Sequence, residues 1–231
     1  MTHSQTGFRS AVTHFIRNQK ILVPPQYSRF YRDYRGREFA FLDVGCGNHS
    51  ASTAKRWFPQ CRYHGIDRTM YNNDETDLAS MEEMYEIDLE KESLDPIRDG
   101  FYDLVLVNHV IEHLPNGLAV LEALTAKLRP GGRMYIEYPA ARSLALPSLS
   151  GTLNFCDDDT HVRVYDLKDV ANALLTNEMR VLRGGIRRSW LRVALIPVTL
   201  PLALVKGNPA VPLWDLLRFA EFIYAEKRSS I

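Results

Sequence analysis

The chain has 231 residues, and its 28 Lys and Arg residues balance 28 Asp and Glu residues to a formal net charge of zero. A neutral chain lacks the positive field that nucleic-acid-binding proteins usually carry, so a nucleic-acid partner is not expected. A chain of this length buries a core large enough to fold without disulfides or a structural metal. The three cysteines form no CxxC pair, and the first 20 residues lack the apolar run of a signal peptide, so we expect a cytoplasmic protein.

Apolar side chains at helical spacing predict two short helices before the main domain. The first set is Phe8, Val12, Phe15 and Ile16, and the second, after a Pro-Pro break, is Tyr27, Phe30, Tyr31 and Tyr34. Aromatic residues at this spacing favour packing over a substrate-binding box. We therefore expect a helical cap over residues 1–36 and a main domain over residues 37–231.

From Phe39 onward, short apolar runs alternate with helical patterns. The runs FAFLDV, RYHGID, MYEIDL, YDLVLV and RMYIEY are predicted strands, a further strand is expected near Val181, and FAEFIYAEK is predicted to be an edge strand. Helices are predicted from Leu118 to Leu128 and after Asp166, an expected N-cap. Strands that are apolar on both faces and alternate with helices predict a Rossmann-like α/β fold, with a mostly parallel sheet covered by helices on both faces.

One segment near the end of the chain is nearly all apolar. It runs from Val193 to Val205, and Pro197 and Pro201 interrupt it, so it is too short and too broken to span a bilayer. We expect a buried or partner-covered hairpin within an apolar insertion at about residues 186–214. The alternatives are a flap that contacts a membrane surface or a lipid-like acceptor, and a homodimer interface.

A glycine loop follows the first predicted strand. Asp43 ends that strand, and Gly45 and Gly47 come directly after it. Without Cβ atoms, two glycines let the backbone turn sharply and approach a ligand closely at a helix N-terminus. Asp67 ends the second strand 24 residues after Asp43, where a carboxylate can accept hydrogen bonds from ribose hydroxyls. Asp88 ends the third predicted strand, and each acid also has a structural explanation as a strand end or cap.

Five ordered pieces of sequence carry a family resemblance. They are LDVGCGN, YHGID, EIDLE, FYDLVLVNHVIEHL and LRPGGRMYIEYP, and a sixth, THVRVYDLKDV, follows them. With these pieces the chain resembles the class I S-adenosylmethionine-dependent methyltransferases, in particular the small-molecule group related to ubiquinone biosynthesis. The resemblance implies a seven-stranded sheet, S-adenosyl-L-methionine as the cofactor, and methyl transfer to a small-molecule acceptor, with oxygen favoured over nitrogen or carbon.

The resemblance also implies roles for single residues. The cofactor loop would be Asp43, Gly45, Cys46 and Gly47, the ribose would bind Asp67, the adenine would lie against Arg68, Asp88 and Leu89, and the methionine end would meet Asn108 and His109. Family members carry a small residue where this chain has His49, which would crowd the loop or contact the methionine carboxylate. A nicotinamide enzyme is disfavoured because the third glycine of GxGxxG is missing.

A sulfonium is an activated methyl donor, so the protein mainly has to align a nucleophile and exclude water. A hydroxyl acceptor would also need a base, for which His109 and His161 are the candidates, whereas His113 is expected to be structural. The string from His109 to His113 matches HxxEH, and Asp157, Asp158 and Asp159 adjoin His161, but the methyltransferase context predicts no metal site.

Two further interpretations stay open. The basic cluster Arg180, Arg183, Arg187, Arg188 and Arg192 is either a solvated face or a site for the phosphate or carboxylate of a lipid-linked acceptor. The function is either methyl transfer, to a small, lipid-linked or macromolecular acceptor, or binding of S-adenosylmethionine by a non-catalytic regulatory protein. Neutral charge and the lack of an NPPY tetrapeptide after the fourth strand disfavour methylation of nucleic-acid bases.

Overall fold

The computed structural model describes residues 23–229. The chain divides into two compact units, Met1–Arg35 and Gly36–Ile231, and only residues 23–35 of the first are described. Here η1 (Pro25–Tyr27) and α2 (Tyr31–Tyr34) replace the second predicted helix, and the first predicted helix lies outside the described residues. The ring of Phe30 packs against those of Tyr27 and Tyr34, with centroids 5.8 and 6.2 Å apart, so these aromatics serve packing.

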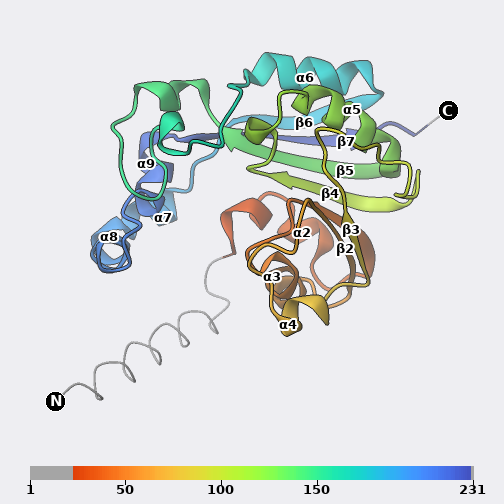
Figure 1. The fold of residues 1–231 in the computed structure, drawn as a ribbon, viewed down its shortest axis with the longest axis horizontal. Helices are drawn as coiled ribbons and strands as arrows, with labels where there is room; N and C mark the ends of the chain where they lie inside the picture. Colours follow the sequence, from red (N-terminus) through yellow and green to blue (C-terminus); the bar gives the residue numbers. More distant parts are fainter. Residues whose placement is uncertain (1–22, 230–231) are drawn as a thin grey trace. The chain divides into compact units, whose positions relative to one another are not determined.

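The second unit is built on a sheet of seven strands among its described residues (Figure 1). The strands are β1 (Phe39–Val44), β2 (Cys61–Asp67), β3 (Glu83–Glu86), β4 (Tyr102–Asn108), β5 (Leu128–Pro139), β6 (Met179–Ile186) and β7 (Ala220–Lys227). Their order is β3-β2-β1-β4-β5-β7-β6, and only β7 runs antiparallel to its neighbours. The predicted Rossmann-like fold is confirmed.

The sequence explains why β1 lies at the centre of the sheet. Every residue from Phe39 to Val44 is buried, as expected for a parallel strand covered on both faces. Phe41 aligns with Tyr63 of β2 on one side and with Leu104 of β4 on the other. The chain order therefore reverses at β1, and ligands of open α/β sheets bind at such a switch point, beyond the carboxyl ends of the strands.

Helices cover both faces of the sheet (Figure 1). The helices α5 (Gly117–Lys127) and α6 (Leu167–Thr176) pack side by side on one face, and α3 (Ser50–Trp57) and the short α4 (Glu75–Leu78) lie on the other. Asp166 caps α6 as predicted, because its side chain accepts a hydrogen bond from the backbone N–H of Lys168 at 2.8 Å. The first residue of β5 is Leu128, which was expected to close the preceding helix.

Two strands differ from the predictions. The strand β3 ends at Glu86, so Asp88 lies in the loop beyond it and does not end a strand. The strand β7 is not at the edge: it lies between β5 and β6, and its residues Phe222 to Ala225 are buried. Alternating polarity in FAEFIYAEK marks a strand but carries no information about which strands pair with it, because that depends on residues distant in the sequence.

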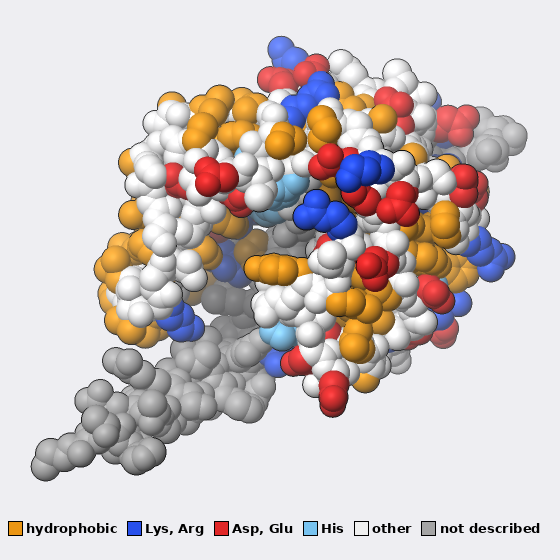
Figure 2. All heavy atoms as spheres, in the orientation of Figure 1, with side chains coloured by type: hydrophobic (Ala, Val, Ile, Leu, Met, Phe, Trp, Pro, Cys, Tyr) orange, Lys and Arg blue, Asp and Glu red, His pale blue; other side chains and the backbone are white. Residues whose placement is uncertain are grey.

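The apolar insertion joins β6 to β7 and is helical. It contains α7 (Trp190–Ala194), α8 (Ile196–Val205), η5 (Val211–Leu213) and α9 (Trp214–Leu217). The expectation of a buried hairpin is wrong, since α7 and α8 bury no residue against the described part of the chain, and Val198 and Val205 are 62% and 69% exposed. Hydrophobic side chains gather over the position of α8 (Figure 2). No described helix is long and apolar enough to cross a membrane.

The base of the insertion is anchored in a second, smaller core. Leu153 from the loop after β5 packs with Ala210, Phe219 and Ala220, which flank α9 and begin β7. The loop after β5 also contains η3 (Ala141–Ala145) and η4 (Phe155–Asp157). Two segments that are distant in sequence are thereby held together beyond the carboxyl end of β5.

Candidate functional site

A cavity of about 450 Å³ opens at the carboxyl ends of β1, β2 and β4. This volume lies within the range of roughly 300–1,000 Å³ that is usual for small-molecule sites. The lining residues come from five separate segments: Gly45, Gly47 and Asn48; Asp67, Arg68, Thr69 and Tyr71; Ile87, Asp88, Leu89 and Glu90; His109, Val110, His113 and Leu114; and Thr160 and Val162.

The glycine loop has no room for side chains. Gly45 has a φ of +76°, and a Cβ atom there would lie 2.6 Å from Cγ2 of Val110. A Cβ atom on Gly47 would lie 2.9 Å from the carbonyl oxygen of Tyr71 and 3.3 Å from a carboxylate oxygen of Asp67. Both glycines are therefore needed for the tight approach of the loop to the cavity.

The carboxylate of Asp67 is fixed at the rim of the cavity. Its Oδ2 accepts a hydrogen bond from the backbone N–H of Gly47 at 3.0 Å, and its Oδ1 accepts one from that of Arg68 at 2.7 Å. Each carboxylate oxygen can accept a second hydrogen bond. Asp67 thus joins the glycine loop to the end of β2 and keeps acceptor capacity for ligand hydroxyls.

Three residues expected to bind the cofactor do not line the cavity: Asp43 and Cys46 of the predicted loop, and Asn108 of the predicted methionine end. Asp43 is buried, and its Oδ2 accepts a hydrogen bond from the Tyr63 hydroxyl at 2.6 Å. Burial, with a smaller contribution from the charge of Asp67, raises the pKa of Asp43 to about 7. Cys46 is buried with its Sγ 3.4 Å from Sδ of Met84, and burial raises the pKa of its thiol. Asn108, at the end of β4, also lies outside the lining.

The loop after β3 is held by its own polar contacts. Oδ2 of Asp88 is 2.9 Å from Nζ of Lys91, and Oδ1 accepts a hydrogen bond from the backbone N–H of Glu90 at 3.1 Å. The hydrogen bond from Lys91 holds the pKa of Asp88 below its usual value. Leu89 gives this side of the cavity an apolar surface, and Arg68 lines the same cavity.

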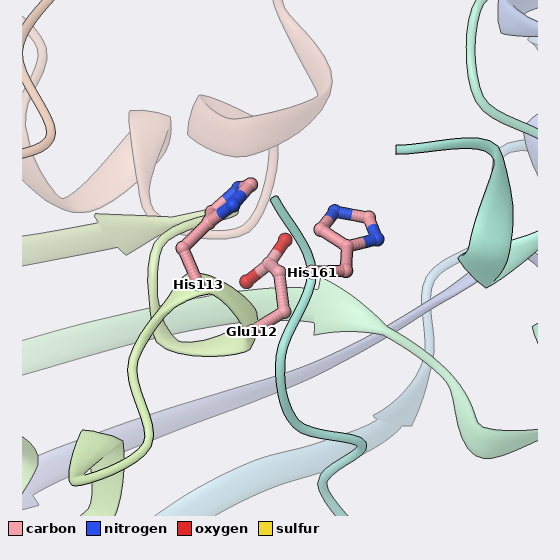
Figure 3. Close-up of side chains that lie close together, drawn as sticks. All are labelled: Glu112, His113 and His161. Carbon is pink, nitrogen blue, oxygen red and sulfur yellow. The ribbon is translucent and has the colours of Figure 1, made fainter. Parts of the chain in front are cut away.

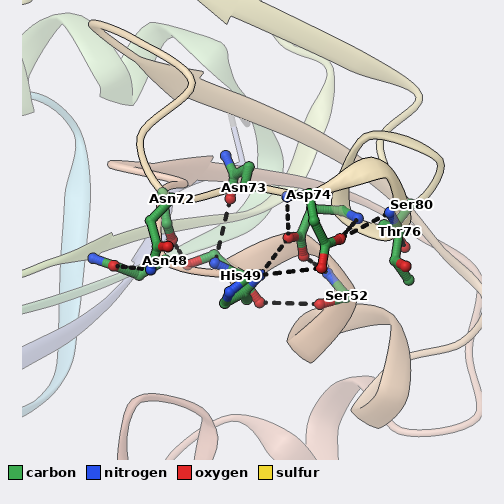
Figure 4. Close-up of polar contacts among 11 residues, drawn as sticks. Asn48, His49, Ser52, Asn72, Asn73, Asp74, Thr76 and Ser80 are labelled. Carbon is green, nitrogen blue, oxygen red and sulfur yellow. Dashed lines mark hydrogen bonds and ion pairs between the residues drawn. The ribbon is translucent and has the colours of Figure 1, made fainter.

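His49 is not among the residues that line the cavity, contrary to expectation, and its side chain lies in a polar network beside Asp74 (Figure 4). Its Nδ1 lies 2.6 Å from Oδ2 of the buried Asp77, and its backbone adopts a left-handed conformation with a φ of +60°. Burial would raise the pKa of Asp77, but hydrogen bonds from Ser52, Asp74 and His49 lower it to about 2. His49 therefore ties the glycine loop to α4 and leaves the cavity open.

His109 lies in the cavity wall between two acids. Its Nδ1 is 3.0 Å from Oε1 of Glu112, and its Nε2 is 3.4 Å from Oε1 of Glu137. Burial alone would lower the pKa of His109, but the two carboxylates raise it to about 9. Both ring nitrogens are thus directed at carboxylates, and the ring is positively charged at neutral pH.

This pairing continues as a buried chain of alternating charges. Glu137 lies 2.9 Å from Nε of Arg187, and Nη1 of Arg187 lies 3.3 Å from Oδ2 of Asp215. Burial would raise the pKa of Glu137, but the charge of Arg187 together with the contacts to His109 and Tyr135 outweighs this effect, and the pKa is lowered. This series of buried charges extends from the cavity wall to Asp215 on α9. Buried ion pairs therefore connect the apolar insertion to the site.

Comparison with known proteins identifies the fold and the family. The family described as methyltransferase domain matches residues 22–182, well over half of the chain. The chain belongs to this methyltransferase family. The family resemblance that the sequence pieces carry is thus confirmed.

Two curated relatives are O-methyltransferases. A ubiquinone biosynthesis O-methyltransferase of Marinobacter nauticus is 28% identical over 129 residues, covering 52% of this chain and 54% of that protein. The mycinamicin VI 2''-O-methyltransferase of Micromonospora griseorubida is 29% identical over 125 residues, covering 49% and 30%. The chain therefore spans about half the length, or less, of the curated relatives that it matches.

A solved structure supports the fold assignment. The phosphoethanolamine N-methyltransferase 2 of Haemonchus contortus, in complex with S-adenosyl-L-methionine, superposes with a TM-score of 0.61 at 14% identity. The superposition covers 88% of this chain and 52% of that chain. At this identity the similarity concerns the fold of the methyltransferase domain alone.

Sequence reasoning missed part of the site of the methyltransferase domain. His113, expected to be structural, lines the cavity, whereas His161, a predicted base, does not. The two rings are neighbours, with centroids 4.8 Å apart, and the carboxylate of Glu112 lies near both of them (Figure 3). The Glu112-His113 pair after β4 was the sequence signal for this part of the site. Its neighbour His161 lies 48 residues further along the sequence, on another loop, so the sequence did not show that they come together.

The arginines of the predicted basic cluster do not form one anion-binding surface. Arg180 pairs with Glu226 at 2.7 Å, and Arg187 is buried between Glu137 and Asp215. The guanidinium of Arg188 stacks on the ring of Trp190, 3.8 Å from its centroid. Arg180 and Arg187 thus pair with acids of the domain, and the buried Arg187 is not available to the phosphate of an acceptor.

Proposed function

We propose that the chain is an S-adenosyl-L-methionine-dependent methyltransferase that transfers a methyl group to an oxygen atom of a small molecule. The family match and the names of the curated relatives support this reaction. The observation that carries the proposal is the contact between Gly47 and Asp67 at the rim of the cavity. It joins a glycine turn to a fixed carboxylate, the pair of features that a nucleoside site requires.

Each part of the cavity suits one part of this ligand. Asp67 would accept hydrogen bonds from the ribose hydroxyls, and Leu89 would pack against the adenine, with Arg68 and Asp88 at its edge. The backbone at Gly45 and Gly47, which both line the cavity, would approach the methionine portion. Neither position has room for a Cβ atom, so only glycine permits this loop conformation. Asp43, Cys46 and Asn108 would support this surface from outside the lining.

His109 would act as a positioning residue. Both of its ring nitrogens face carboxylates, at 3.0 and 3.4 Å, so no nitrogen is available to take a proton from the acceptor. Its backbone has a φ of +55°, a strained conformation for a residue with a side chain. The ion pairs with Glu112 and Glu137 would hold this strained residue, and with it the end of β4, in place.

S-adenosylmethionine would supply an already activated methyl group, so the residues of the chain have only to align the acceptor and exclude water. The acceptor oxygen would bind beside His113 and Thr160, which line the same cavity as Asp67 and Leu89. His161, adjacent to His113, remains a candidate for contact with the acceptor hydroxyl.

The test is the formation of S-adenosylhomocysteine from S-adenosylmethionine with a panel of phenols, catechols and sugar hydroxyls. We expect turnover with at least one class, and a loss of at least about a hundredfold in Gly45→Ala, since a misplaced ligand costs this much. Gly100→Ala is the matched control: Gly100 also has a positive φ, +62°, but a Cβ atom there meets nothing within 4 Å. Ligand binding without any turnover would instead indicate a regulatory binding protein.

We propose further that the α7–α8 pair contacts an anionic phospholipid surface, from which a lipid-like acceptor is taken. Trp190, Val198 and Leu204 are 68%, 62% and 61% exposed. Residues 189–214 contain no Asp or Glu, whereas Arg192 and Lys206 flank the apolar stretch. Exposed apolar helices with basic ends are typical of proteins that lie on a membrane surface.

Co-sedimentation with phosphatidylglycerol-containing and pure phosphatidylcholine vesicles tests this surface. We expect binding to the anionic vesicles, and its loss in Val198→Ser/Leu204→Ser. The control Val164→Ser/Leu175→Ser removes two exposed apolar residues elsewhere and should bind normally. Equal binding by both double variants contradicts the proposal, and a dimer that the α8 variant dissociates would identify a homodimer interface instead.

We also propose that the chain functions in the cytoplasm. Cys46, Cys61 and Cys156 are free thiols, and Cys156 is exposed. A reducing compartment keeps such thiols unpaired.

A further inference from the structure

Three metal-ligating side chains converge beside the cavity (Figure 3). One potential ligand atom from each of Glu112, His113 and His161 lies within 4.8 Å of the others. Glu112 and His113 come from η2 (Ile111–His113), directly after β4, and His161 comes from the loop that follows η4. The topology therefore brings together two imidazoles and one carboxylate that the sequence separates.

The carboxylate of Glu112 is buried, and only one of its two oxygens accepts a hydrogen bond from the described residues. Its Oε1 accepts a hydrogen bond from Nδ1 of His109, whereas its Oε2 is buried without a hydrogen-bond partner within residues 23–229. Burying a charged oxygen without a partner costs free energy, so this atom favours a positively charged or hydrogen-bonding ligand beside it. His109 does not satisfy Oε2, because its other nitrogen faces Glu137.

Hydrogen bonds orient both imidazoles. Nδ1 of His161 lies 2.7 Å from the carbonyl oxygen of Phe155, and Nδ1 of His113 lies 3.2 Å from that of Thr160. A carbonyl oxygen only accepts, and the Thr160 hydroxyl, 2.9 Å from Nδ1 of His113, donates its proton to Asp158. These contacts assign the proton of each ring to Nδ1 and, in the neutral ring, the lone pair to Nε2. Metal-binding histidines show this arrangement, in which the second nitrogen donates to a carbonyl or carboxylate.

The backbone holds the two halves of the cluster together. The N–H groups of Val162 and Arg163 both donate to the carbonyl oxygen of Glu112, at 2.9 and 3.2 Å. His161, one residue earlier, is thereby fixed beside η2, and its side chain is only 5% exposed. The cluster is therefore part of the fold and not a chance meeting of surface side chains.

We propose that Glu112, His113 and His161 bind a divalent transition-metal ion at the acceptor end of the cavity. Two imidazoles and one carboxylate suit zinc and related metals better than magnesium or calcium. In a tetrahedral site the ligand atoms lie about 3.4 Å apart, so a separation of up to 4.8 Å requires only small side-chain movements. This proposal departs from the expectation of no metal.

The remaining coordination positions would face the cavity, because His113 and Thr160 line it. Here the inference rests on the proposed function: the open position would take the acceptor hydroxyl. A metal-bound hydroxyl loses its proton more easily, and the proton would pass to water in the cavity. The oxygen would then form its bond to the methyl carbon as the bond from carbon to sulfur breaks, leaving S-adenosylhomocysteine.

A second His-carboxylate cluster in the same domain lacks these features. His49, Asp74 and Asp77 also converge, but their contacts form a closed network (Figure 4). Oδ2 of Asp77 accepts hydrogen bonds from His49 and from the backbone of Asp74, and Oδ1 of Asp74 accepts two backbone hydrogen bonds. This cluster caps α4 and supplies a matched control.

The experiment titrates the metal-stripped full chain with Zn²⁺ by calorimetry and with Co²⁺ by visible absorption, without cofactor. We expect one ion per chain, a Co²⁺ spectrum of nitrogen and oxygen ligands, and affinity lowered more than about tenfold in His161→Gln and Glu112→Gln. His49→Gln should bind as the parent does, and far-UV circular dichroism should show all three variants folded.

Equal affinity in His161→Gln and the parent, or no stoichiometric binding by the parent, would overturn the metal site. Asp67→Ala separates this result from the proposed function. It should lose S-adenosylhomocysteine binding and keep Co²⁺ binding, because Asp67 is not a ligand of the cluster. A parent protein that binds S-adenosylhomocysteine but no Co²⁺ would contradict the metal site alone, and a parent that binds Co²⁺ but no S-adenosylhomocysteine would contradict the proposed function alone.

Discussion

Asp43 is a buried acid, and its burial disfavours the ionised form of the carboxyl group. Its pKa is raised from an ordinary value near 3.8 to about 7, so the folded protein takes up a proton that the unfolded chain releases. The associated stability is fully present below pH 3.8 and is lost as the pH rises to about 7. At neutral pH and above, the wild-type chain therefore carries an energetic cost at this position.

Asp43→Asn should remove that cost. We expect the variant to be more stable than the parent at pH 8, by up to about 4 kcal/mol, with an advantage that shrinks as the pH falls toward 4. The amide oxygen can still accept the hydrogen bond from Tyr63. Urea unfolding at several pH values measures this, and Asp95→Asn, at an exposed position, is the control. A stability difference that is independent of pH would contradict the assignment.

Sequence reasoning was strongest for residues whose role depends on backbone geometry. Gly45, Gly47 and Asp67 lie where the strand-loop pattern predicted them, because a tight turn restricts the residue types it accepts. It was weakest for His109, since Glu137 approaches from a neighbouring strand and changes the chemistry of the ring. No local pattern reports such a partner, so its proposed role as a base could not be weighed from sequence.

Among the elements, the junction of β6, β5 and α9 depends on Arg187. Its guanidinium separates two buried carboxylates, those of Glu137 and Asp215. Removing one member of a buried ion pair leaves an uncompensated charge and typically costs about 3–5 kcal/mol. The junction should therefore be the most charge-sensitive connection between the sheet and the apolar insertion.

We accordingly expect Arg187→Met to lower the free energy of unfolding by about 3–5 kcal/mol. Arg183→Met changes an exposed arginine on β6, the strand that ends directly before Arg187, and should have an effect near zero. Urea unfolding followed by tryptophan fluorescence reports the change, because Trp214 lies beside Arg187. Similar losses in both variants would mean that the buried ion pairs contribute little.

Most strands and the helices α5 and α6 could be predicted, because their apolar periodicity matches their burial. The positions of β7 and of the α7–α8 pair could not. The pairing of β7 depends on β5 and β6, which are distant in sequence, and an apolar run such as Ile196–Val205 usually indicates burial. Its exposure is a property of the assembled domain.

For the molecule as a whole, the parallel sheet gathers five loops at one edge. The loops after β1, β2 and β3 line the part of the cavity that we propose holds the nucleoside, and those after β4 and β5 line the part that we propose holds the acceptor. The sequence pieces predicted that Gly45, Gly47 and Asp67 would lie together, and all three line the cavity. The convergence of Glu112, His113 and His161 emerged only from the three-dimensional arrangement.

Calorimetric titration of the full chain with S-adenosylhomocysteine tests the nucleoside site most directly. We predict saturable binding by the parent and by Glu75→Ala, an exposed acid on α4, and affinity at least about tenfold weaker in Asp67→Ala. Each hydrogen bond to a charged group contributes about 1.5–3 kcal/mol, so the loss of this carboxylate should weaken the affinity measurably. A folded Asp67→Ala protein that binds as tightly as the parent would contradict the assignment of the site.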